Sequence, residues 1–182
     1  MHRLETSLRV AASALVLLVV AIWAWQEFAP EAGSPRTARA TGEPAEGAGQ
    51  EWDVVSVIDG DTLIARRDGV VESVRLLVID APEREQCGYD DARDALVSLV
   101  EGRTVVLVPG SPDDRDQYGR LLRYVEVAVD GETVDAGERL LELGLAAAIY
   151  DSRIGFPRHD REAEYIAADD AAPDLCPDMR EH

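Results

Sequence analysis

One segment of the chain reads as strand, turn and strand: Val54-Val55-Ser56-Val57-Ile58-Asp59-Gly60-Asp61-Thr62-Leu63-Ile64. Side chains that alternate between two faces predict a half-buried strand up to Ile58. Gly60 lets the backbone turn tightly, and a second strand begins at Thr62. Two carboxylates, Asp59 and Asp61, flank that glycine. The segment therefore predicts a β-hairpin with acidic side chains at its turn.

A second segment repeats the order of an apolar strand followed by acids: Val74-Arg75-Leu76-Leu77-Val78-Ile79-Asp80-Ala81-Pro82-Glu83. If the two strand ends lie together, they place Asp61, Asp80 and Glu83 around one point. Carboxylate oxygens gathered in this way suit Ca²⁺ or Mg²⁺. The alternative is that these acids only form turns and caps.

The spacing of apolar and turn residues predicts a β-rich α+β domain. Asp68-Gly69 indicates a hairpin turn, and the five expected strands with interposed helices suggest a small Greek-key barrel of the OB type. The strands are expected at residues 52–58, 62–67, 71–79, 104–108 and 121–129, and the helices at 91–100, 138–148 and 158–172.

The N-terminal part differs from this domain in composition. Residues 10–25 form an apolar run that is long for a signal-peptide core and short for a spanning helix. Arg3 and Arg9 precede it, so the N-terminus is expected in the cytoplasm and the remainder outside. We expect residues 1–29 to be a membrane anchor that stays uncleaved. A secreted product cleaved near Ala38-Arg39-Ala40 is the alternative, and a buried globular helix is a third.

Residues 30–50 are rich in Ala, Gly, Pro and Glu and carry no aliphatic branched or aromatic side chain. Such a segment buries too little to fold, so a flexible linker is expected. The folded domain is then expected to occupy residues 51–182. We expect a monomer whose partners are its substrate and, if the leader is retained, the membrane.

The charge of the chain is strongly acidic. The net charge is −18, from 36 acids against 18 bases, and every base is Arg because the sequence contains no Lys. A coat for general nucleic-acid binding is normally basic. A polyanion would therefore have to be held by local arginines or by a metal ion. The alternative explanation of the acidity is solubility or salt tolerance.

Phosphodiester hydrolysis requires an activated water and neutralisation of the phosphoryl oxygens. Asp61 and Asp80 are the candidates for a metal site, and Glu83 is the candidate for activating water. Arg75 and Arg120 are candidates for binding phosphate, because a guanidinium pairs two oxygens at once.

The chain has two cysteines, Cys87 and Cys176, too far apart for a short-spaced metal site. Outside the cytoplasm they can pair as a disulfide. The alternative is two unrelated thiols.

Three blocks together resemble the staphylococcal nuclease (thermonuclease) family. They are Val57-Ile58-Asp59-Gly60-Asp61-Thr62, the segment from Val74 to Glu83, and Asp116-Gln117-Tyr118-Gly119-Arg120. The resemblance covers residues 54–172, and a single block would be weak. It implies an OB-fold barrel and Ca²⁺-dependent cleavage of DNA and RNA, in which water attacks phosphorus and expels the 5′ oxygen.

The resemblance also implies roles for individual residues. Asp61 and Asp80 would be side-chain ligands of Ca²⁺, Ala81 would offer its carbonyl, Glu83 would be the general base, and Arg75 and Arg120 would stabilise the phosphate. Tyr118 and Tyr150 match positions that contact the nucleotide, and the alternative for each ring is packing within the domain.

Two features leave alternatives open. Gly137 stands where an Asn is common in the family at the start of the helix, so local packing and hydrogen bonding are expected to differ there. The run from Asp113 to Asp116 is expected to be a solvated loop, with a second Ca²⁺ site as the alternative.

The rival to a nuclease is a non-catalytic OB-type binding module at the cell surface. A third reading is a Ca²⁺ site that only stabilises the barrel.

Overall fold

The computed structural model describes residues 49–176, all within one compact unit of the chain. The predicted leader, residues 1–29, and residues 30–48 of the predicted linker lie outside the described residues. The anchor and the cleavage site therefore stay predictions. Within residues 49–176, no helix is both long enough and apolar enough to cross a membrane.

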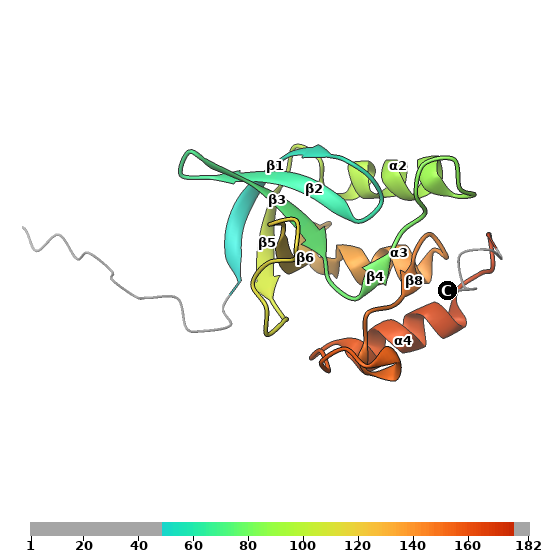
Figure 1. The fold of residues 1–182 in the computed structure, drawn as a ribbon. Coiled ribbons are helices and arrows are strands. Elements are labelled where there is room, and N and C mark those ends of the chain that lie inside the picture. Colours follow the sequence, from blue (N-terminus) through green and yellow to red (C-terminus); the bar gives the residue numbers. More distant parts are fainter. Residues whose placement is uncertain (1–48, 177–182) are drawn as a thin grey trace, which may run out of the picture. The chain divides into compact units, whose positions relative to one another are not determined.

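Five strands form a closed barrel (Figure 1). They are β1 (Gln50–Val57), β2 (Thr62–Arg67), β3 (Val70–Leu76), β5 (Thr104–Pro109) and β6 (Leu121–Val129). Around the wall they follow the order β3-β2-β1-β5-β6, and β6 closes the barrel by pairing in parallel with β3. The predicted five-stranded barrel is confirmed, and its closure is consistent with the OB type.

Local sequence explains the hairpins of this barrel. On β2, Leu63 and Ala65 point into the core and are completely buried. Arg66, the next residue toward the turn, is exposed. Asp68 and Gly69 both have positive φ, of 50° and 83°. Two-residue hairpin turns require this conformation, which matches the right-handed twist of the strands. The predicted Asp68-Gly69 turn is therefore confirmed.

The third strand is shorter than predicted. We expected it over residues 71–79, but β3 ends at Leu76. Val78 has a φ of 64°, which a β-branched residue rarely adopts, and the chain turns out of the barrel there. The residues beyond form β4 (Ile79–Asp80), antiparallel to β8 (Ala147–Ala148). Periodicity could not reveal the break, because Val78 in the turn and Leu76 and Ile79 on either side of it are all buried.

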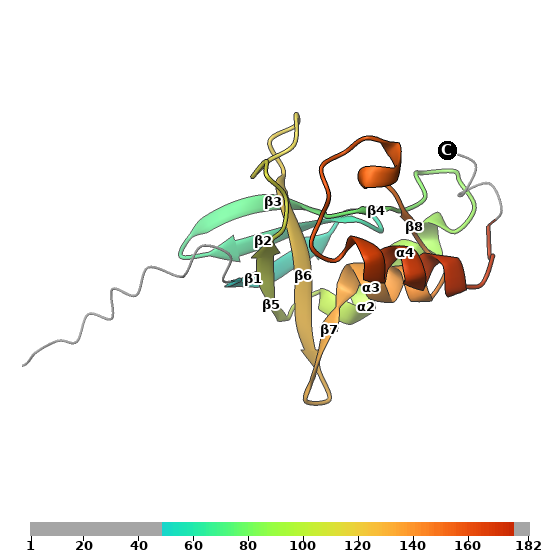
Figure 2. The ribbon, with the colours of Figure 1, turned by 90° about the horizontal axis from the view of Figure 1, so that it is seen from below.

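Three α-helices lie beside the barrel, with α3 between α2 and α4 (Figure 2). They are α2 (Tyr89–Val100), α3 (Ala136–Glu142) and α4 (Glu162–Ala171). In α2, Ala92, Leu96 and Val100 recur every fourth residue and are completely buried. This stripe confirms the helical periodicity on which the prediction of this helix rested.

The prediction for the second helix, over residues 138–148, was wrong in length. Gly144 adopts a left-handed conformation with a φ of 69° shortly after α3 ends, so it terminates the helix instead of weakening its interior. The last predicted helical residues form β8. A strand that was not predicted, β7 (Glu132–Asp135), precedes α3 and pairs with β6. The final helix is also shorter than residues 158–172, and a 3₁₀ turn, η1 (Ser152–Ile154), lies before it.

A polar cluster holds α4 against α3 and the barrel. Arg161 pairs with Asp135 and Glu126, and its guanidinium carbon lies 4.4 Å from the centre of the Tyr124 ring. Asp135 caps α3 by accepting from the amide of Gly137 at 2.9 Å. The Tyr165 hydroxyl donates to the same Asp135 oxygen at 2.8 Å.

Gly137 is explained by this cluster. A Cβ at this position would lie 2.7 Å from the hydroxyl oxygen of Tyr165, closer than real Cβ atoms approach. Tyr165 cannot move away easily, because it is 1% exposed and its hydroxyl is bonded to Asp135. The local hydrogen bonding and packing are therefore explained: Asp135 caps the helix, and Tyr165 fills the space of a side chain at residue 137.

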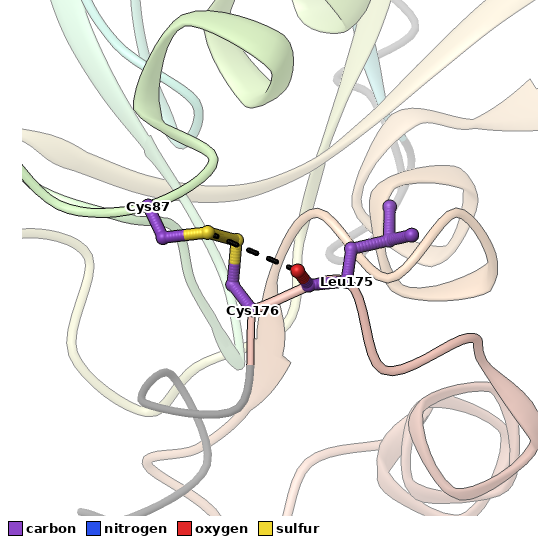
Figure 3. The surroundings of a disulfide bond; sticks show 3 residues. All are labelled: Cys87, Leu175 and Cys176. Carbon is purple, nitrogen blue, oxygen red and sulfur yellow. Dashed lines mark hydrogen bonds between the residues drawn. A yellow bond between two sulfur atoms is a disulfide. The ribbon is translucent and has the colours of Figure 1, made fainter.

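Cys87 and Cys176 form a disulfide (Figure 3), with Cα atoms 5.7 Å apart. The bond joins the loop before α2 to the end of the described chain. The predicted disulfide is therefore present, and the alternative of two unrelated thiols is wrong. The loop that it fastens also carries Glu83, and Gly88 packs against the sulfur of Cys176.

We predict that Gly137→Ala destabilises the domain by about 1–3 kcal/mol, because overpacking outweighs the roughly 1 kcal/mol gained in helix propensity. Urea unfolding followed by circular dichroism measures the difference. In a Tyr165→Phe background, which removes the clashing oxygen, the same substitution should cost markedly less. Equal costs in both backgrounds would show that the Tyr165 hydroxyl is not what excludes a side chain at residue 137.

We predict that replacing both Cys87 and Cys176 by Ser lowers the free energy of unfolding by about 4 kcal/mol, since the bridge closes a loop across a separation of 89 residues. Urea titration of the oxidised protein and of the double variant provides the measurement. Reductant should bring the wild type to the midpoint of the variant and leave the variant unchanged. A wild-type midpoint insensitive to reductant would rule this contribution out.

Candidate active site

Asp61 lies at the turn between β1 and β2 and is buried, with 7% of its surface exposed. Its amide donates to Asp59 Oδ1 at 3.2 Å, so Asp59 shapes the turn. Its two carboxylate oxygens accept from the Thr62 hydroxyl at 2.9 Å and the Ala81 amide at 3.0 Å. Burial raises the pKa of Asp61 to about 6, although the Arg75 guanidinium acts to lower it. The ionised form of this carboxylate therefore gains from further positive charge.

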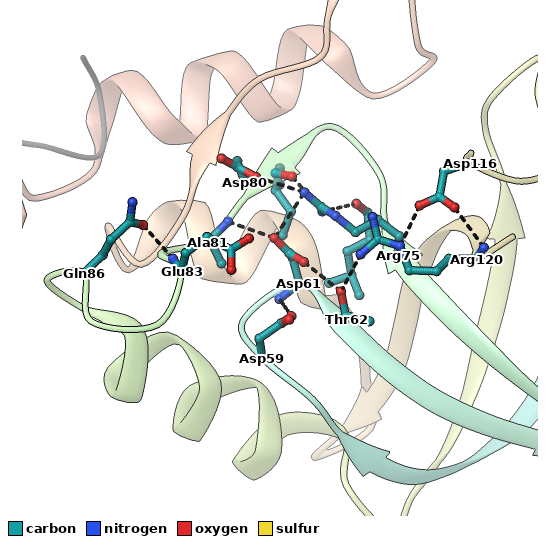
Figure 4. A network of polar contacts seen from close by, with 12 residues as sticks. Asp59, Asp61, Thr62, Arg75, Asp80, Ala81, Glu83, Gln86, Asp116 and Arg120 are labelled. Atoms are coloured by element: carbon teal, nitrogen blue, oxygen red, sulfur yellow. Dashed lines mark hydrogen bonds and ion pairs between the residues drawn. The ribbon is translucent and has the colours of Figure 1, made fainter. Parts of the chain in front are cut away.

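Arg75 is the centre of the site, and it is also buried, at 8% exposure (Figure 4). Its Nη2 lies 3.1 Å from Asp61 Oδ2 and donates to Asp80 Oδ1 at 3.0 Å. Its Nη1 donates to the carbonyls of Leu76 at 2.9 Å and Ile79 at 2.8 Å. A buried guanidinium needs such compensation, and here carboxylates and backbone oxygens supply it.

The turn at Val78 explains how Asp80 reaches Arg75. Residues separated by an odd number lie on opposite faces of a regular strand. The positive φ of Val78 interrupts the strand between them, and the Ile149 amide then fixes the Val78 carbonyl at 2.9 Å. The strand predicted over residues 71–79 did not include this turn, which the structure places at Val78.

The carboxylates of Asp61 and Asp80 could hold a divalent cation together with the backbone oxygen of Ala81. Within residues 49–176, no three His, Cys, Asp or Glu side chains are close enough to form a metal-binding cluster. Two carboxylates suffice for a hard cation that keeps water or phosphate oxygens as its other ligands. The Asp61 side chain is 10% exposed and that of Asp80 is 33% exposed, so the pair opens to solvent on the Asp80 side. The oxygen donors and the buried Asp61 charge fit such an ion.

Glu83 lies on the loop that follows β4, two residues beyond Ala81 (Figure 4). Its amide donates to Gln86 Oε1 at 2.6 Å, which closes the loop on itself. The residue as a whole is exposed to solvent. The loop therefore presents Glu83 beside the buried carboxylates and not within their hydrogen-bond network.

Arg120 lies next to this group and is oriented by Asp116. Its Nε donates to Asp116 Oδ2 at 2.6 Å, and its Nη1 donates to the Thr62 hydroxyl at 3.2 Å. The other Asp116 oxygen accepts from the amides of Tyr118 and Arg120, both at 2.9 Å. Burial alone would raise the pKa of Asp116, but these hydrogen bonds lower it. Asp116 is thus a carboxylate fixed by hydrogen bonds that orients the guanidinium of Arg120.

The two tyrosines predicted to meet substrate are at the surface. Tyr118 is 76% exposed, and the Arg120 guanidinium carbon lies 5.4 Å from its ring centre. Tyr150 is 40% exposed, and Arg75 lies 5.9 Å from its ring centre. Burial raises the pKa of Tyr150, as does the charge of Asp80, whereas Arg75 lowers it. Neither ring belongs to the barrel core, although the Tyr150 ring packs edge-on against that of Phe156.

The structure brings most of the predicted residues into one hydrogen-bonded group: Asp61, Arg75, Asp80, the Ala81 amide and, through Thr62, Arg120. Thr62 in this group and Asp116, which holds Arg120, were not predicted to be part of the site. Thr62 bridges the Asp61 and Arg120 halves, and Asp116 was expected in a solvated loop. The spacing Asp-x-Tyr-Gly-Arg could have indicated Asp116, because an Asp that accepts two residues ahead is typical of a turn.

Comparison with known proteins identifies the family. A protein-family model described as "Staphylococcal nuclease homologue" matches residues 73–174, which is more than half of the chain. "Protein ParB" of Escherichia coli is 35% identical over 130 residues, which is 71% of this chain and 59% of that protein. The SPbeta prophage-derived endonuclease YokF of Bacillus subtilis is 39% identical over 99 residues, 51% of this chain and 32% of that protein.

"Thermonuclease" of Staphylococcus hyicus is 27% identical over 154 residues, 81% of this chain and 82% of that protein. The chain covers less than two thirds of ParB and YokF, so these two relatives contain much that this chain does not match. The matched region contains Arg75, Asp80, Glu83 and Arg120 but begins after Asp61. This chain belongs to the staphylococcal nuclease homologue family.

Proposed function

We propose that the protein is a metal-dependent nuclease that hydrolyses phosphodiester bonds in DNA and RNA. The observation that carries the proposal is the convergence of Asp61 and Asp80, from two separate strand ends, on Arg75, with Arg120 connected through Thr62. Relatives named endonuclease and thermonuclease support the reaction class.

Ca²⁺ is the cation that we propose for the site. Asp61 and Asp80 would hold it with the Ala81 carbonyl, and this small set of hard oxygens leaves positions for water and phosphate. When bound, the ion supplies positive charge at the phosphate and helps to activate water. Arg75 then no longer needs to be the sole counterion of the two carboxylates, and its guanidinium can pair with a phosphoryl oxygen.

The chain's own residues divide the remaining work. Glu83, exposed on its loop, takes the proton of the attacking water. Arg75 and Arg120 stabilise the charge that develops on the phosphoryl oxygens, since both are held by carboxylates before the substrate arrives. The water attacks phosphorus, the 5′ oxygen leaves, and the product keeps a 3′ phosphate.

We further propose that the folded domain acts outside the cytoplasm. The disulfide supports this, because such bonds persist in oxidising compartments. The apolar run at residues 10–25 is consistent with export, either as a membrane anchor or as a cleaved leader. N-terminal sequencing of the protein from its host separates these two possibilities.

We predict Ca²⁺-dependent cleavage of single-stranded DNA by the full chain, lost on chelation. Glu83→Gln should lower kcat by about 10²–10⁴-fold through loss of the base. Arg120→Ala should lower it by about 10²–10³-fold through loss of transition-state charge stabilisation. Gel assays under single-turnover conditions measure these rates, and the 3′ phosphate is identified by resistance of the product to tailing.

The rival functions give different results in this experiment. A folded protein that binds another protein or an oligosaccharide but cleaves no nucleic acid under any divalent cation would contradict the nuclease. Thermal stabilisation by Ca²⁺ without turnover would indicate a purely structural ion. Faster cleavage with Mg²⁺ than with Ca²⁺ would refute only the identity of the ion.

We predict that Asp116→Asn lowers kcat roughly tenfold to hundredfold with little change in stability. Asn can still accept the two amide hydrogen bonds of the turn but loses the charge that holds Arg120. Asp114→Asn is the matched control, because Asp114 lies on the same loop and pairs with Arg123. In an Arg120→Ala background, Asp116→Asn should have no further effect, and an undiminished effect there would exclude a positioning role.

A further inference from the structure

The loop that carries Glu83 lies between β4 and α2, and its residues from Glu83 to Cys87 are exposed. The Glu83 amide donates to Gln86 Oε1 at 2.6 Å, and the Gln86 amide donates to the Glu83 carbonyl at 3.0 Å. Both bonds are local, so they shape the loop without connecting it to the barrel. The position of Glu83 therefore depends on how the two ends of the loop are held.

The two ends are held in different ways. At the first end, the Ala81 amide donates to Asp61 Oδ2 at 3.0 Å. At the second end, just before α2, Cys87 is bonded to Cys176, which is 4% exposed. A Cβ at Gly88 would lie 3.2 Å from the Cys176 sulfur, so this sulfur packs against the loop backbone. The disulfide therefore fixes the second end by packing as well as by its covalent bond.

The loop backbone is strained between these two ends. Glu85 has a φ of 73°, a conformation that a residue with a side chain rarely adopts. Such strain persists only where the surroundings enforce it. The disulfide at Cys87, two residues later, supplies this constraint. Breaking the bond would therefore allow the loop to relax.

The segment that carries Cys176 is itself anchored to the fold (Figure 3). It follows α4, and the Pro173 carbonyl oxygen packs so closely on Gly144 that a Cβ there would lie 2.1 Å from it. The Leu175 amide donates to the same carbonyl at 3.1 Å. The disulfide therefore ties the Glu83 loop to a fixed point through a short stretch of chain.

We propose that the Cys87–Cys176 disulfide positions Glu83, so that the enzyme is fully active only when this bond is oxidised. This rests on the proposed nuclease function, in which Glu83 takes a proton from water, and adds regulation to it. A general base must lie within hydrogen-bond distance of the proton that it removes, and a displacement of about 1 Å can slow a reaction about 10²-fold. Release of the loop lowers the rate without removing any group of the site.

Reduction by a dithiol follows the usual exchange chemistry. One thiolate of the reductant attacks the sulfur of Cys87, the exposed partner, forms a mixed disulfide and releases Cys176 as a thiolate. The second thiolate of the reductant attacks its own sulfur in that mixed disulfide, so Cys87 leaves and the reductant becomes a cyclic disulfide. Two electrons and the two protons of the dithiol pass to the cysteines. The chain would thus stay poorly active in a reducing compartment and gain activity in an oxidising one.

The test is cleavage of single-stranded DNA by the full chain, in saturating Ca²⁺, before and after treatment with a dithiol. Reduction should lower kcat about 10–10²-fold and change KM less than about twofold. The double variant Cys87→Ser, Cys176→Ser should show the low kcat with or without reductant. Circular dichroism establishes that each protein is folded under the assay conditions.

A second variant separates positioning from stability. Insertion of Gly-Gly-Gly between Asp174 and Leu175 keeps the disulfide but slackens its connection to the fold. The entropy of the closed loop changes little, because it depends only weakly on loop length. This variant should keep the wild-type melting temperature and show a kcat close to that of the reduced enzyme. Gly137→Ala is the opposite control, because it lowers stability away from this loop and should leave kcat unchanged.

The effect of reduction on kcat should shrink toward onefold in a Glu83→Gln background, since the group that is positioned is then absent. Trypsin gives a readout that does not depend on catalysis. Cleavage after Arg84, which is exposed in the loop, should accelerate on reduction. Cleavage after Arg103, which is exposed between α2 and β5, should keep its rate.

Three results would overturn the proposal. They are an unchanged kcat after reduction of the folded enzyme, a wild-type kcat in the glycine insertion, and an undiminished effect of reduction in the Glu83→Gln background. If the oxidised wild type cleaves no nucleic acid, the nuclease function itself fails. Trypsin then still decides whether the disulfide holds the loop, and an equal rate of cleavage after Arg84 in both redox states shows that it does not.

Discussion

The buried guanidinium of Arg75 is the interaction on which the site depends. It sits between Asp61 and Asp80 and also donates to two backbone carbonyls of the segment that links β3 to β4. A charge in this position would be costly without those partners. The same contacts fix the backbone between β3 and β4, so the ion pairs and the local backbone stabilise each other. Loss of either acid would leave the guanidinium less compensated.

This arrangement explains how an acidic protein can receive a polyanion. The net charge of −18 repels nucleic acid at long range, and Arg75 and Arg120 are themselves paired with the carboxylates of Asp61, Asp80 and Asp116. Asp116 and Thr62 orient Arg120, while Asp61 and Asp80 hold Arg75. A cation between the carboxylates would reverse the local balance toward phosphate. Under the proposed function, binding would be governed by this one region and not by the whole surface.

Rigid and exposed parts of the site have separate structural sources. The buried Asp61 and Arg75 lie at the ends of barrel strands, and Asp80 lies on β4, whereas Glu83, Tyr118 and Tyr150 lie on loops. Those loops are fastened individually: the Glu83 loop by the Cys87–Cys176 disulfide, and the Tyr150 turn by the buried Asp151. Loops carry variable contacts on a fixed scaffold in many proteins. Here the disulfide and the hydrogen bonds of Asp151 keep the two loops near the charged side chains of the site.

The sequence by itself determined the five-stranded barrel, the Asp68-Gly69 turn and the set of acids and arginines, because alternation and turn chemistry are local properties. Only the tertiary structure decided where β3 ends, since Val78 is apolar and buried whether or not the strand continues. It also decided the role of Gly137, which is set by the hydroxyl of a tyrosine on another helix. Thr62 gained its place in the same way, because its hydroxyl accepts from Arg120, 58 residues later in the chain, and no local pattern encodes that contact.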